Sequence, residues 1–450
     1  MTSDWHAATD TWGTGRHLSS SRRMDRRLHD VIPGGAHTYA KASDQYPEGL
    51  APVIVRGQGA HVWDVDGNRY LEYGSGLRSV TLGHAHPRVT AAVTRQLALG
   101  SNFTRPAAIE LQAAEALLAL LPRAQMVKFA KNGSDATTAA VRLARAVTGR
   151  NLVAICRDHP FFSVDDWFIG ATAMPAGIPA SVREQTLTFG YGDLEGTRAM
   201  LEQHTGQVAC LVLEAMTQIP PPPGWFAGLR RLCDEHGTLL VLDEMITGFR
   251  YAFGGAQDLV DADPDLSTFG KAMGNGFAVS ALAGRREYMR RGGLDHDQER
   301  VFLLSTTHGA ETHALAAHLA VIETHREEDV VGALDQRGRQ LASRLTAAIE
   351  AADVADHLLV LGPPCNLVHA TLDAEGQRSQ PFRTLFLAEL LERGVLAPSF
   401  VVSTAVSEDD IEHTAQAVYE AGRVYRKALD EGVQAHLRGR PVRPALRPYA

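Results

Sequence analysis

The segment LLVLDEMITGFR, residues 239–250, begins with four apolar residues and continues with two acids. An uninterrupted apolar run of this length is typical of a strand that is buried on both faces of a parallel sheet. The acids, Asp243 and Glu244, then stand at the carboxyl end of that strand, where open α/β sheets bind their ligands. The segment therefore predicts an α/β fold with a ligand site at this edge of the sheet.

A lysine flanked by glycines follows 28 residues after Asp243, in the segment STFGKAMGNG, residues 267–276. Taken alone, Lys271 would be a solvated surface residue and Asp243 a helix cap. Together they suit pyridoxal phosphate, which needs an amine to hold its aldehyde as a Schiff base and an anion to keep its ring nitrogen protonated. The pair predicts Asp243 and Lys271 as the catalytic residues of a pyridoxal-phosphate enzyme.

The segments VLDEMITGFRYAFGGAQ and STFGKAMGNGF resemble the class III aminotransferases of fold type I, and among them most the glutamate-1-semialdehyde 2,1-aminomutases. The resemblance extends over most of the chain. It implies a large domain with a mostly parallel seven-stranded sheet and a small α+β domain built from both chain ends. The expected parts are an N-terminal arm with part of the small domain, the large cofactor domain, the rest of the small domain and a basic Pro/Arg tail, at residues 1–75, 76–325, 326–430 and 431–450.

The composition excludes several classes of partner. The chain has 450 residues, 45% of them hydrophobic and 21% charged, which is ordinary for a globular protein with a large core. Its net charge of −8 gives no general attraction to nucleic acid or anionic membranes, and no apolar run is long enough for a membrane helix. The four cysteines lack metal or redox spacing, and the N-terminus lacks a signal-peptide pattern. We expect a cytoplasmic enzyme that acts on small molecules and binds no metal.

A strand, a glycine turn and a helix follow one another near residue 130. The apolar strand 126–130 runs into the segment KNGS, residues 131–134, after which small and apolar residues recur at helical spacing. A helix N-terminus offers free N–H groups to a phosphate, and we expect Ser134 as its N-cap. The resemblance implies that Asn132, Gly133 and Ser134 bind the cofactor phosphate.

Four further positions are assigned to the cofactor ring by the resemblance. The tyrosine that stacks on the ring in the family falls on Phe161 or Phe162, depending on one inserted residue. A phenyl face stacks as well as a phenol face, so either residue suits this role. Glu214 ends the predicted strand 209–214 and matches a glutamate near the ring in the family, and Met245 completes the set.

Thr307 matches, without gaps, the family threonine that crosses the dimer interface to the phosphate of the partner's cofactor. The resemblance therefore implies a homodimer in which Thr307 acts across the interface. The Ser-Gly-Asn-Pro that follows in the family is replaced here by Gly-Ala-Glu-Thr, residues 309–312, which is a change close to the site.

Three departures from the aminomutase pattern concern the substrate. Lys41 takes the place of an arginine that grips the substrate carboxylate, and a lysine lacks the bidentate fork of arginine. The loop that follows Ser399 is shorter and lacks a substrate glutamate. Arg78 stands where the family is small and apolar, which predicts recognition of a substrate anion or hydroxyls, with a surface or interface salt bridge as the alternative. Gln218 borders the cofactor and is the third expected substrate residue.

The predicted function is transfer of an amino group from an amino-acid donor to the carbonyl of a small metabolite, with Lys271 as general base and acid. Analogy to divergent family members suggests an oxidised (amino) sugar of natural-product or polysaccharide biosynthesis as the acceptor. Three alternatives stay open: a glutamate-1-semialdehyde 2,1-aminomutase, a pyridoxal-phosphate-dependent epimerase or lyase acting on an aminated substrate, and a cofactor-binding protein without catalysis.

Overall fold

The structure, a computed structural model, describes residues 16–159 and 161–443. The start of the predicted N-terminal arm and the end of the predicted basic tail lie outside these ranges. The chain forms two compact units, which we call the terminal unit and the central unit. The terminal unit comprises Met1–Ser75, Leu82–His86 and Gly332–Ala450, and the central unit comprises Gly76–Thr81 and Pro87–Val331.

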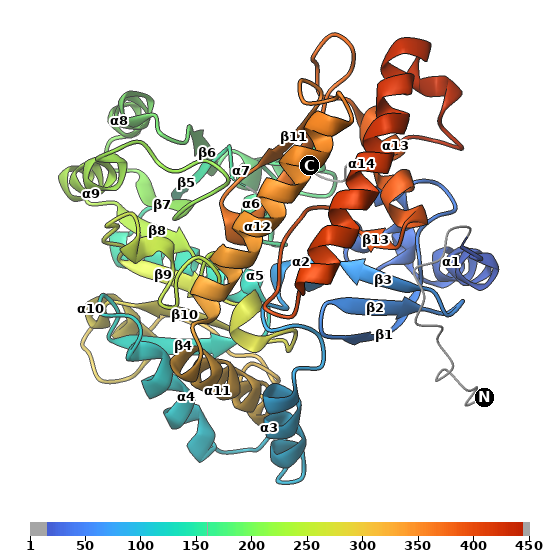
Figure 1. The fold of residues 1–450 in the computed structure, drawn as a ribbon. Helices are drawn as coiled ribbons and strands as arrows, with labels where there is room; N and C mark the ends of the chain where they lie inside the picture. Colours follow the sequence, from blue (N-terminus) through green and yellow to red (C-terminus); the bar gives the residue numbers. More distant parts are fainter. Residues whose placement is uncertain (1–15, 160, 444–450) are drawn as a thin grey trace. The chain divides into compact units, whose positions relative to one another are not determined.

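The central unit is built on a seven-stranded sheet (Figure 1) with the strand order β4-β10-β9-β8-β7-β5-β6. Strand β10 runs antiparallel to both of its neighbours, whereas the other neighbouring strands are parallel to one another. The predicted mostly parallel sheet of seven strands is therefore confirmed. The strands are β4 Met126–Ala130, β5 Leu152–Cys156, β6 Thr186–Phe189, β7 Val208–Glu214, β8 Leu239–Asp243, β9 Leu266–Phe269 and β10 Ser280–Gly284.

The middle strands explain why apolar runs without alternation occur in this sequence. Every residue of β7, β8 and β9 is buried, because helices cover both faces of the sheet. In the register of these strands Glu214 pairs with Asp243, and Asp243 pairs with Thr268. The carboxyl ends of the three strands consequently lie at one edge of the sheet, which we call the catalytic edge.

Helices of the central unit pack on this sheet and on one another. Figure 1 shows α3, α4 and α11 gathered together, and α11 also packs against the short turn η5, Lys271–Gly274. In α5 the alanines that face the sheet are fully buried, since small side chains let the helix approach the strands closely. The helices are α2 Ser75–Arg78, α3 Pro87–Leu97, α4 Ala108–Leu118, α5 Gly133–Thr148, α6 Asp166–Ile169, α7 Ala180–Arg183, α8 Leu194–Gln203, α9 Trp225–His236, α10 Arg286–Met289 and α11 Thr312–Glu327.

The start of α5 differs from the sequence prediction. The helix begins at Gly133 and its N-cap residue is Asn132, so the prediction of Ser134 as N-cap was wrong. The backbone N–H of Asn132 donates to Oδ2 of Asp135 at 2.9 Å, which fixes the cap two residues earlier. Ser134 is thereby free for another contact, and its Oγ accepts the N–H of Val164 at 3.1 Å.

The terminal unit contains a four-stranded sheet of order β1-β2-β3-β13 and a two-stranded sheet of β11 and β12. Strands β2 and β3 pair antiparallel and form a hairpin, and Gly67 in its turn has a left-handed φ of 84°. Strand β13, from far along the chain, pairs in parallel with β3, so the two chain ends share one sheet. The elements are α1 Ser19–Val31, β1 Ile54–Gln58, β2 His61–Asp64, β3 Arg69–Glu72, α12 Val330–Ala351, β11 Leu358–Leu361, β12 Val368–Thr371, α13 Gln380–Glu392, β13 Val395–Leu396 and α14 Glu408–Glu431.

Two general properties of the described residues bear on function. None of their helices has both the length and the hydropathy that crossing a membrane requires. The four cysteines are free and buried. Burial raises the pKa of the thiols of Cys156 and Cys210 to about 12, so neither is a reactive thiolate near neutral pH.

Candidate active site

The catalytic edge brings together three residues that are far apart in the sequence. Glu214 is the last residue of β7, Asp243 is the last residue of β8, and Lys271 follows β9 after one glycine. The three strands are neighbours in the sheet, and each of the two acids influences the pKa of the lysine through its charge. The structure therefore joins the two predicted catalytic residues and places the predicted ring glutamate beside them.

Asp243 is a buried carboxylate with one oxygen held by the protein. Its side chain is 2% exposed, and its Oδ1 accepts hydrogen bonds from the N–H of Met245 at 2.9 Å and from Oγ1 of Thr268 at 3.1 Å. Within the described ranges Oδ2 accepts no hydrogen bond. Burial raises the pKa of Asp243 to about 6, while the charge of Lys271 and the two hydrogen bonds act in the opposite direction. This carboxylate is oriented but has one oxygen left for a cationic partner.

Lys271 begins a tight turn of unusual backbone geometry. Its φ of 48° lies in the left-handed region, which is uncommon for a residue with a side chain. Burial lowers the pKa of its amine, with Asp243 and Glu214 opposing this effect and Arg78 adding to it. A lowered pKa leaves more of the amine unprotonated, and the unprotonated amine is the form that attacks an aldehyde.

Met245 lies between the two glycine-containing loops of the site. A Cβ atom on Gly133, at the start of α5, would lie 3.0 Å from its sulfur, and a Cβ atom on Gly270 would lie 2.5 Å from it. Glycine at both positions therefore lets the two loops approach Met245 without displacing its side chain. The side chain of Met245 is buried, so it forms part of the floor that brings the start of α5 next to the turn of Lys271.

The loop at the start of α5 is held from two sides. Oγ of Ser280 donates to the carbonyl of Asn132 at 2.7 Å, and the N–H of Val164 donates to Ser134. The first N–H groups of a helix have no intrahelical acceptor and point towards its N-terminal end. Asn132, Gly133 and Ser134 thus form a fixed N-terminal loop with the geometry that phosphate groups favour.

The two candidate aromatic residues differ in accessibility. Phe161 is 40% exposed, whereas Phe162 is 2% exposed. The carbonyl of Phe162 accepts a hydrogen bond from Oγ1 of Thr137 at 2.7 Å, and its ring packs against Phe168 with centroids 5.8 Å apart. Phe162 is therefore a core residue, and Phe161 is the one whose ring a ligand can reach.

His159 is a site residue that the sequence prediction missed. It is buried, and its Nδ1 accepts the backbone N–H of Glu214 at 2.8 Å, so it fixes the end of β7. Its ring lies 4.9 Å from that of Tyr191, whose hydroxyl donates to the carbonyl of Ile219 at 3.2 Å. The only sequence signal was the position of His159 just after the strand that ends at Cys156.

Arg78 belongs to the same cluster as the predicted catalytic lysine. It ends a run of four left-handed residues, Ser75 to Arg78, with φ values of 45°, 56°, 61° and 70°. Burial lowers the pKa of Arg78, while the charges of Tyr251 and Glu214 raise it. A strained backbone of this kind persists only where the surrounding structure fixes it, and such strain is common at ligand sites.

The remaining predicted site residues are exposed. Gln218 lies four residues beyond the end of β7. Thr307 is exposed as well, and its carbonyl accepts a hydrogen bond from Nδ2 of Asn102 at 3.0 Å. Lys41 ends the 3₁₀ turn Tyr39–Lys41 of the terminal unit. In the part of the chain that the structure describes, no group of three or more His, Cys, Asp or Glu side chains is arranged to bind a metal.

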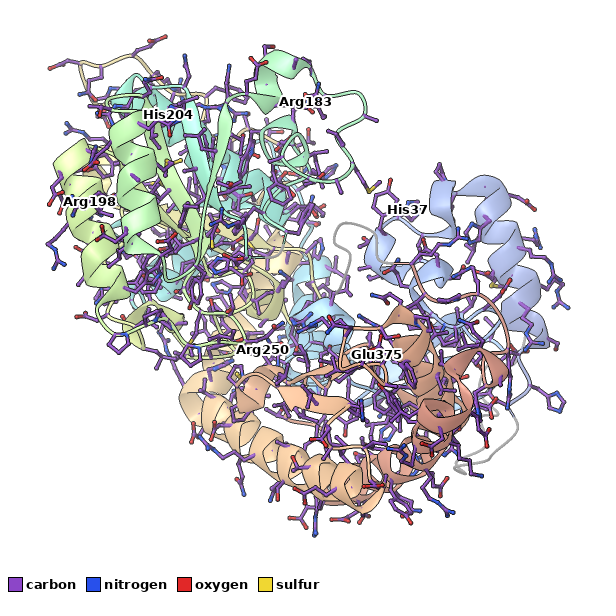
Figure 2. The ribbon with its side chains drawn as sticks, turned by 90° about the horizontal axis from the view of Figure 1, so that it is seen from above. His37, Arg183, Arg198, His204, Arg250 and Glu375 are labelled. Carbon is purple, nitrogen blue, oxygen red and sulfur yellow. The ribbon has the colours of Figure 1, made fainter. Side chains whose placement is uncertain are left out.

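The second acid of the Asp-Glu pair has a structural role that the sequence prediction did not assign. Glu244 is buried and accepts the N–H groups of Ala256 and Gln257 at 2.9 and 2.7 Å. Burial raises its pKa to about 7. Arg250, from the same segment, is fully buried and donates to Oγ1 of Thr81 at 3.2 Å. Figure 2 shows Arg250 in the interior of the central unit and Arg198, on α8, at its edge.

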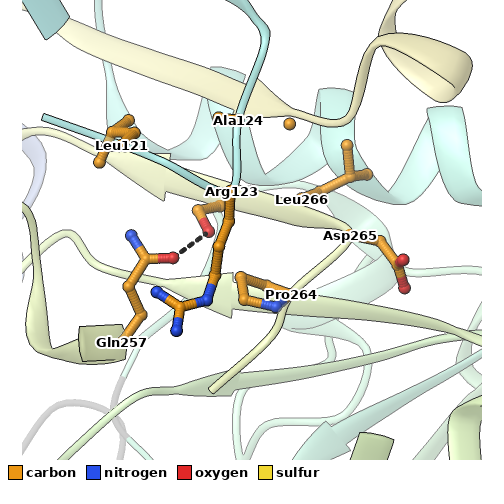
Figure 3. A pocket seen from close by; sticks show the side chains of 9 residues that line it. Leu121, Arg123, Ala124, Gln257, Pro264, Asp265 and Leu266 are labelled. Carbon is orange, nitrogen blue, oxygen red and sulfur yellow. Dashed lines mark hydrogen bonds between the residues drawn. The ribbon is translucent and has the colours of Figure 1, made fainter. Parts of the chain in front are cut away.

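A small cavity lies at the opposite edge of the sheet, next to Leu266 at the start of β9 (Figure 3). Its volume is about 10 Å³, which is at most enough for one water molecule. Gln257 borders it and accepts a hydrogen bond from Oγ of Ser267 at 3.5 Å. This cavity is too small for a substrate.

Comparison with known proteins agrees with this geometry. The family model described as aminotransferase class III matches residues 42–407. The glutamate-1-semialdehyde 2,1-aminomutase of Desulfitobacterium hafniense is 32% identical, over 88% of this chain and 96% of that relative. The protein of the same name from Roseiflexus castenholzii is 34% identical, over 92% of this chain and 99% of that relative.

Solved structures show the same fold. The pyridoxal-phosphate form of the FumI protein of Sphingopyxis sp. MTA144 superimposes with a TM-score of 0.82 at 26% identity, over 92% of this chain and 98% of that one. A glutamate-1-semialdehyde aminomutase of Pseudomonas aeruginosa PAO1 superimposes with a TM-score of 0.78 at 22% identity, over 89% of this chain and 94% of that one. The predicted resemblance is confirmed, and pyridoxal phosphate is the cofactor. The chain belongs to the class III aminotransferase family.

Proposed function

We propose that this protein moves an amino group from an amino-acid donor to the carbonyl of a small metabolite at the catalytic edge. The observation that carries the proposal is that a buried acid and a lysine come together at the ends of the neighbouring strands β8 and β9. Asp243 has one oxygen held by the protein and one left over, and the amine of Lys271 has a lowered pKa. This is the pair of functions that pyridoxal phosphate requires from a protein.

The surrounding residues fit the cofactor. Asn132, Gly133 and Ser134 would hold the phosphate at the start of α5, and Phe161 would offer its accessible phenyl face to the ring. Asp243 would supply the anion that keeps the ring nitrogen protonated. When bound, the cofactor supplies an electron sink for the charge that develops at the donor Cα.

Lys271 has two roles in the proposed reaction. Its Nζ would hold the cofactor while no substrate is bound. Once an amino donor has released it, Nζ would act as general base and then as general acid for the proton of the donor Cα. It would have the same role when the carbonyl acceptor is bound.

We also propose that the enzyme is a cytoplasmic homodimer in which Thr307 contacts the phosphate of the partner's cofactor. The exposure of Thr307, which leaves its side chain available to another chain, supports this arrangement. Lys41, Arg78 and Gln218 are the proposed substrate residues. The charge of half-buried Arg78, close to Glu214 and Lys271, supports an acceptor with an anionic or hydroxylated group, such as an oxidised amino sugar.

A second candidate function is that of a glutamate-1-semialdehyde 2,1-aminomutase. The name of the relatives that are 32% and 34% identical over most of the chain favours it. The replacement of the carboxylate-binding arginine by Lys41 speaks against it. An epimerase or a lyase would use the same first steps on a substrate that already carries an amino group.

The absorption spectrum of the purified holoenzyme, before and after addition of L-glutamate or L-glutamine, tests the proposal. Loss of the Schiff-base band with release of the matching keto acid is the expected result. A band that common donors leave unchanged, together with isomerisation of glutamate 1-semialdehyde, would establish the aminomutase instead. Absence of any band after addition of pyridoxal phosphate would contradict both candidates.

A further inference from the structure

His318, on α11, lies behind the turn that carries Lys271. It is fully buried, and its Nδ1 lies 3.1 Å from the carbonyl oxygen of Met273, two residues after the lysine. A carbonyl can only accept, so the ring must donate from Nδ1–H. The contact therefore fixes both the tautomer of His318 and the position of this carbonyl.

The other sides of the imidazole are apolar. Its ring meets the rings of Phe129 and Phe249 edge-on, with centroids 5.9 and 5.7 Å apart. Among the described residues Nε2 has no hydrogen-bond partner. Burial lowers the pKa of His318 to about 4, because a second N–H would find no acceptor there. The ring is consequently a neutral donor with a single polar contact.

The turn that His318 contacts needs support from outside. Lys271 and Asn275, which flank it, both have left-handed φ values, 48° and 43°. Residues with side chains keep such conformations only when neighbouring structure enforces them. The segment between them is buried, so its carbonyl groups also need donors within the protein.

His318 also contacts the segment that carries Asp243. Phe249, which its ring touches, lies six residues after Asp243, at the end of the segment that contains both acids. One side chain of α11 thus packs against the segment of Asp243 and donates to the turn of Lys271. A purely apolar residue could supply the packing but not the donor.

We propose that His318 is a positioning residue, which holds Lys271 in reach of the cofactor through its Nδ1–H donation to Met273. This inference rests on the proposed role of Lys271. The hydrogen bond sets where the backbone of the turn lies, and the backbone sets where Nζ lies relative to Asp243. The role requires a donor at the Nδ1 position, which distinguishes it from simple filling of the core.

Three substitutions of His318 distinguish the loss of its hydrogen-bond donor from the loss of its side-chain volume. In His318→Asn the amide nitrogen takes the place of Nδ1, whereas His318→Gln offers its nitrogen near the Nε2 position and His318→Leu offers none. The matched control is His325→Leu on the same helix. His325 is also buried and touches Phe249 with centroids 5.7 Å apart, but it makes no hydrogen bond to the turn of Lys271.

Each holoenzyme is measured in three ways: the pH midpoint of its Schiff-base band, the dissociation constant of pyridoxal phosphate and the melting temperature. We expect His318→Leu and His318→Gln to shift the pH midpoint and to weaken cofactor binding about fivefold, the factor for one lost hydrogen bond. His318→Asn should restore both values. His325→Leu should lower only the melting temperature.

Two results would overturn the inference. One is that His318→Leu and His318→Gln change only the melting temperature, as the control does. The other is that His318→Asn, when folded, behaves like His318→Leu. If a variant fails to fold, the other donor-free variant decides.

Failure of the proposed function itself would look different. The wild-type protein would then show no Schiff-base band. In that case a rate of chemical modification replaces the spectrum. A small amine-reactive reagent modifies Lys271 in the cofactor-free protein, and peptide mass spectrometry follows the reaction. An unchanged rate in His318→Leu would reject the positioning role independently of any cofactor.

Discussion

Two buried aspartates stand at opposite edges of the same sheet, and their surroundings differ. Asp243 and Asp265 are each 2% exposed, and burial raises the pKa of both. Asp265, at the edge shown in Figure 3, contacts Arg230 at 3.0 Å and Arg285 at 3.5 Å. It also accepts the N–H of Leu240 at 2.7 Å, so both of its oxygens are used.

Among the residues that the structure describes, no arginine pairs with Asp243 in this way. Its two hydrogen bonds both go to Oδ1, and its charged neighbour is Lys271, whose own pKa is lowered. A structural acid is compensated within the fold, whereas a functional acid is left incomplete until a ligand arrives. The difference supports the proposed role of Asp243 without reference to any relative.

The largest effect is expected from removal of the lysine at the catalytic edge. Lys271→Ala should abolish the Schiff-base band and lower the turnover rate by roughly 10²–10⁴-fold, the usual contribution of a general acid–base group. Lys128→Ala, which removes an exposed lysine of β4, is the control and should leave the rate unchanged. A Lys271→Ala protein with normal activity would remove the proposed mechanism.

The comparison itself is tested by replacing each aspartate with asparagine. Asp243→Asn should keep its contacts through Oδ1 and lower the turnover rate by roughly 10²-fold or more, because the cofactor ring loses its anion. Asp265→Asn should leave the site intact but cost about 3 kcal/mol of unfolding free energy, since Arg230 and Arg285 lose their partner.

Turnover and urea unfolding, measured on both variants, decide the matter. The comparison would fail if Asp265→Asn impaired turnover while Asp243→Asn impaired only stability.

The burial of His318 behind the catalytic edge predicts how the free energy of unfolding depends on pH. His318 has a folded pKa of about 4, below its ordinary value of 6.5, so the unfolded chain binds more protons between these pH values. Stability from neutral His318 is therefore present above pH 6.5 and is lost as the pH falls towards 4, about 2 kcal/mol of it by pH 5.

The raised pKa values of Asp243 and Glu244, about 6 and about 7, act in the opposite direction over this range. The measurement is therefore the difference in unfolding free energy between the wild type and His318→Leu, taken at pH 7.5 and at pH 5. The difference should shift in favour of the variant at pH 5. An equal difference at both values would mean that His318 is already protonated or accessible in the folded protein.

The smallest effect is expected from Ser134 at the phosphate loop. Ser134→Ala removes the acceptor of the Val164 N–H and a hydroxyl close to the phosphate, and should weaken binding of pyridoxal phosphate about fivefold. Pyridoxal, which has no phosphate, is the matched control and should bind equally well to both proteins. Equal weakening for both ligands would place Ser134 outside the phosphate site.

Much of the fold could be predicted because its signals are local. The apolar runs of β7 and β8 end at the acids Glu214 and Asp243, as the sequence predicts. The sheet of the large domain followed from the family resemblance. The N-cap of α5 was misplaced, because Ser134 and Asn132 are both good capping residues and only the contact with Asp135 chooses between them.

The sequence by itself determined the cofactor and the two residues that suit it, because Asp243 and Lys271 each stand in a distinctive local pattern. Only the tertiary structure decided which phenylalanine is accessible, which of two buried aspartates pairs with arginines, and that His159 and His318 contact the segments of the site. His159 meets Glu214 and His318 meets Met273 across 55 and 45 residues of chain. Contacts between such distant segments depend on how helices and strands pack, and no local pattern of residues encodes them.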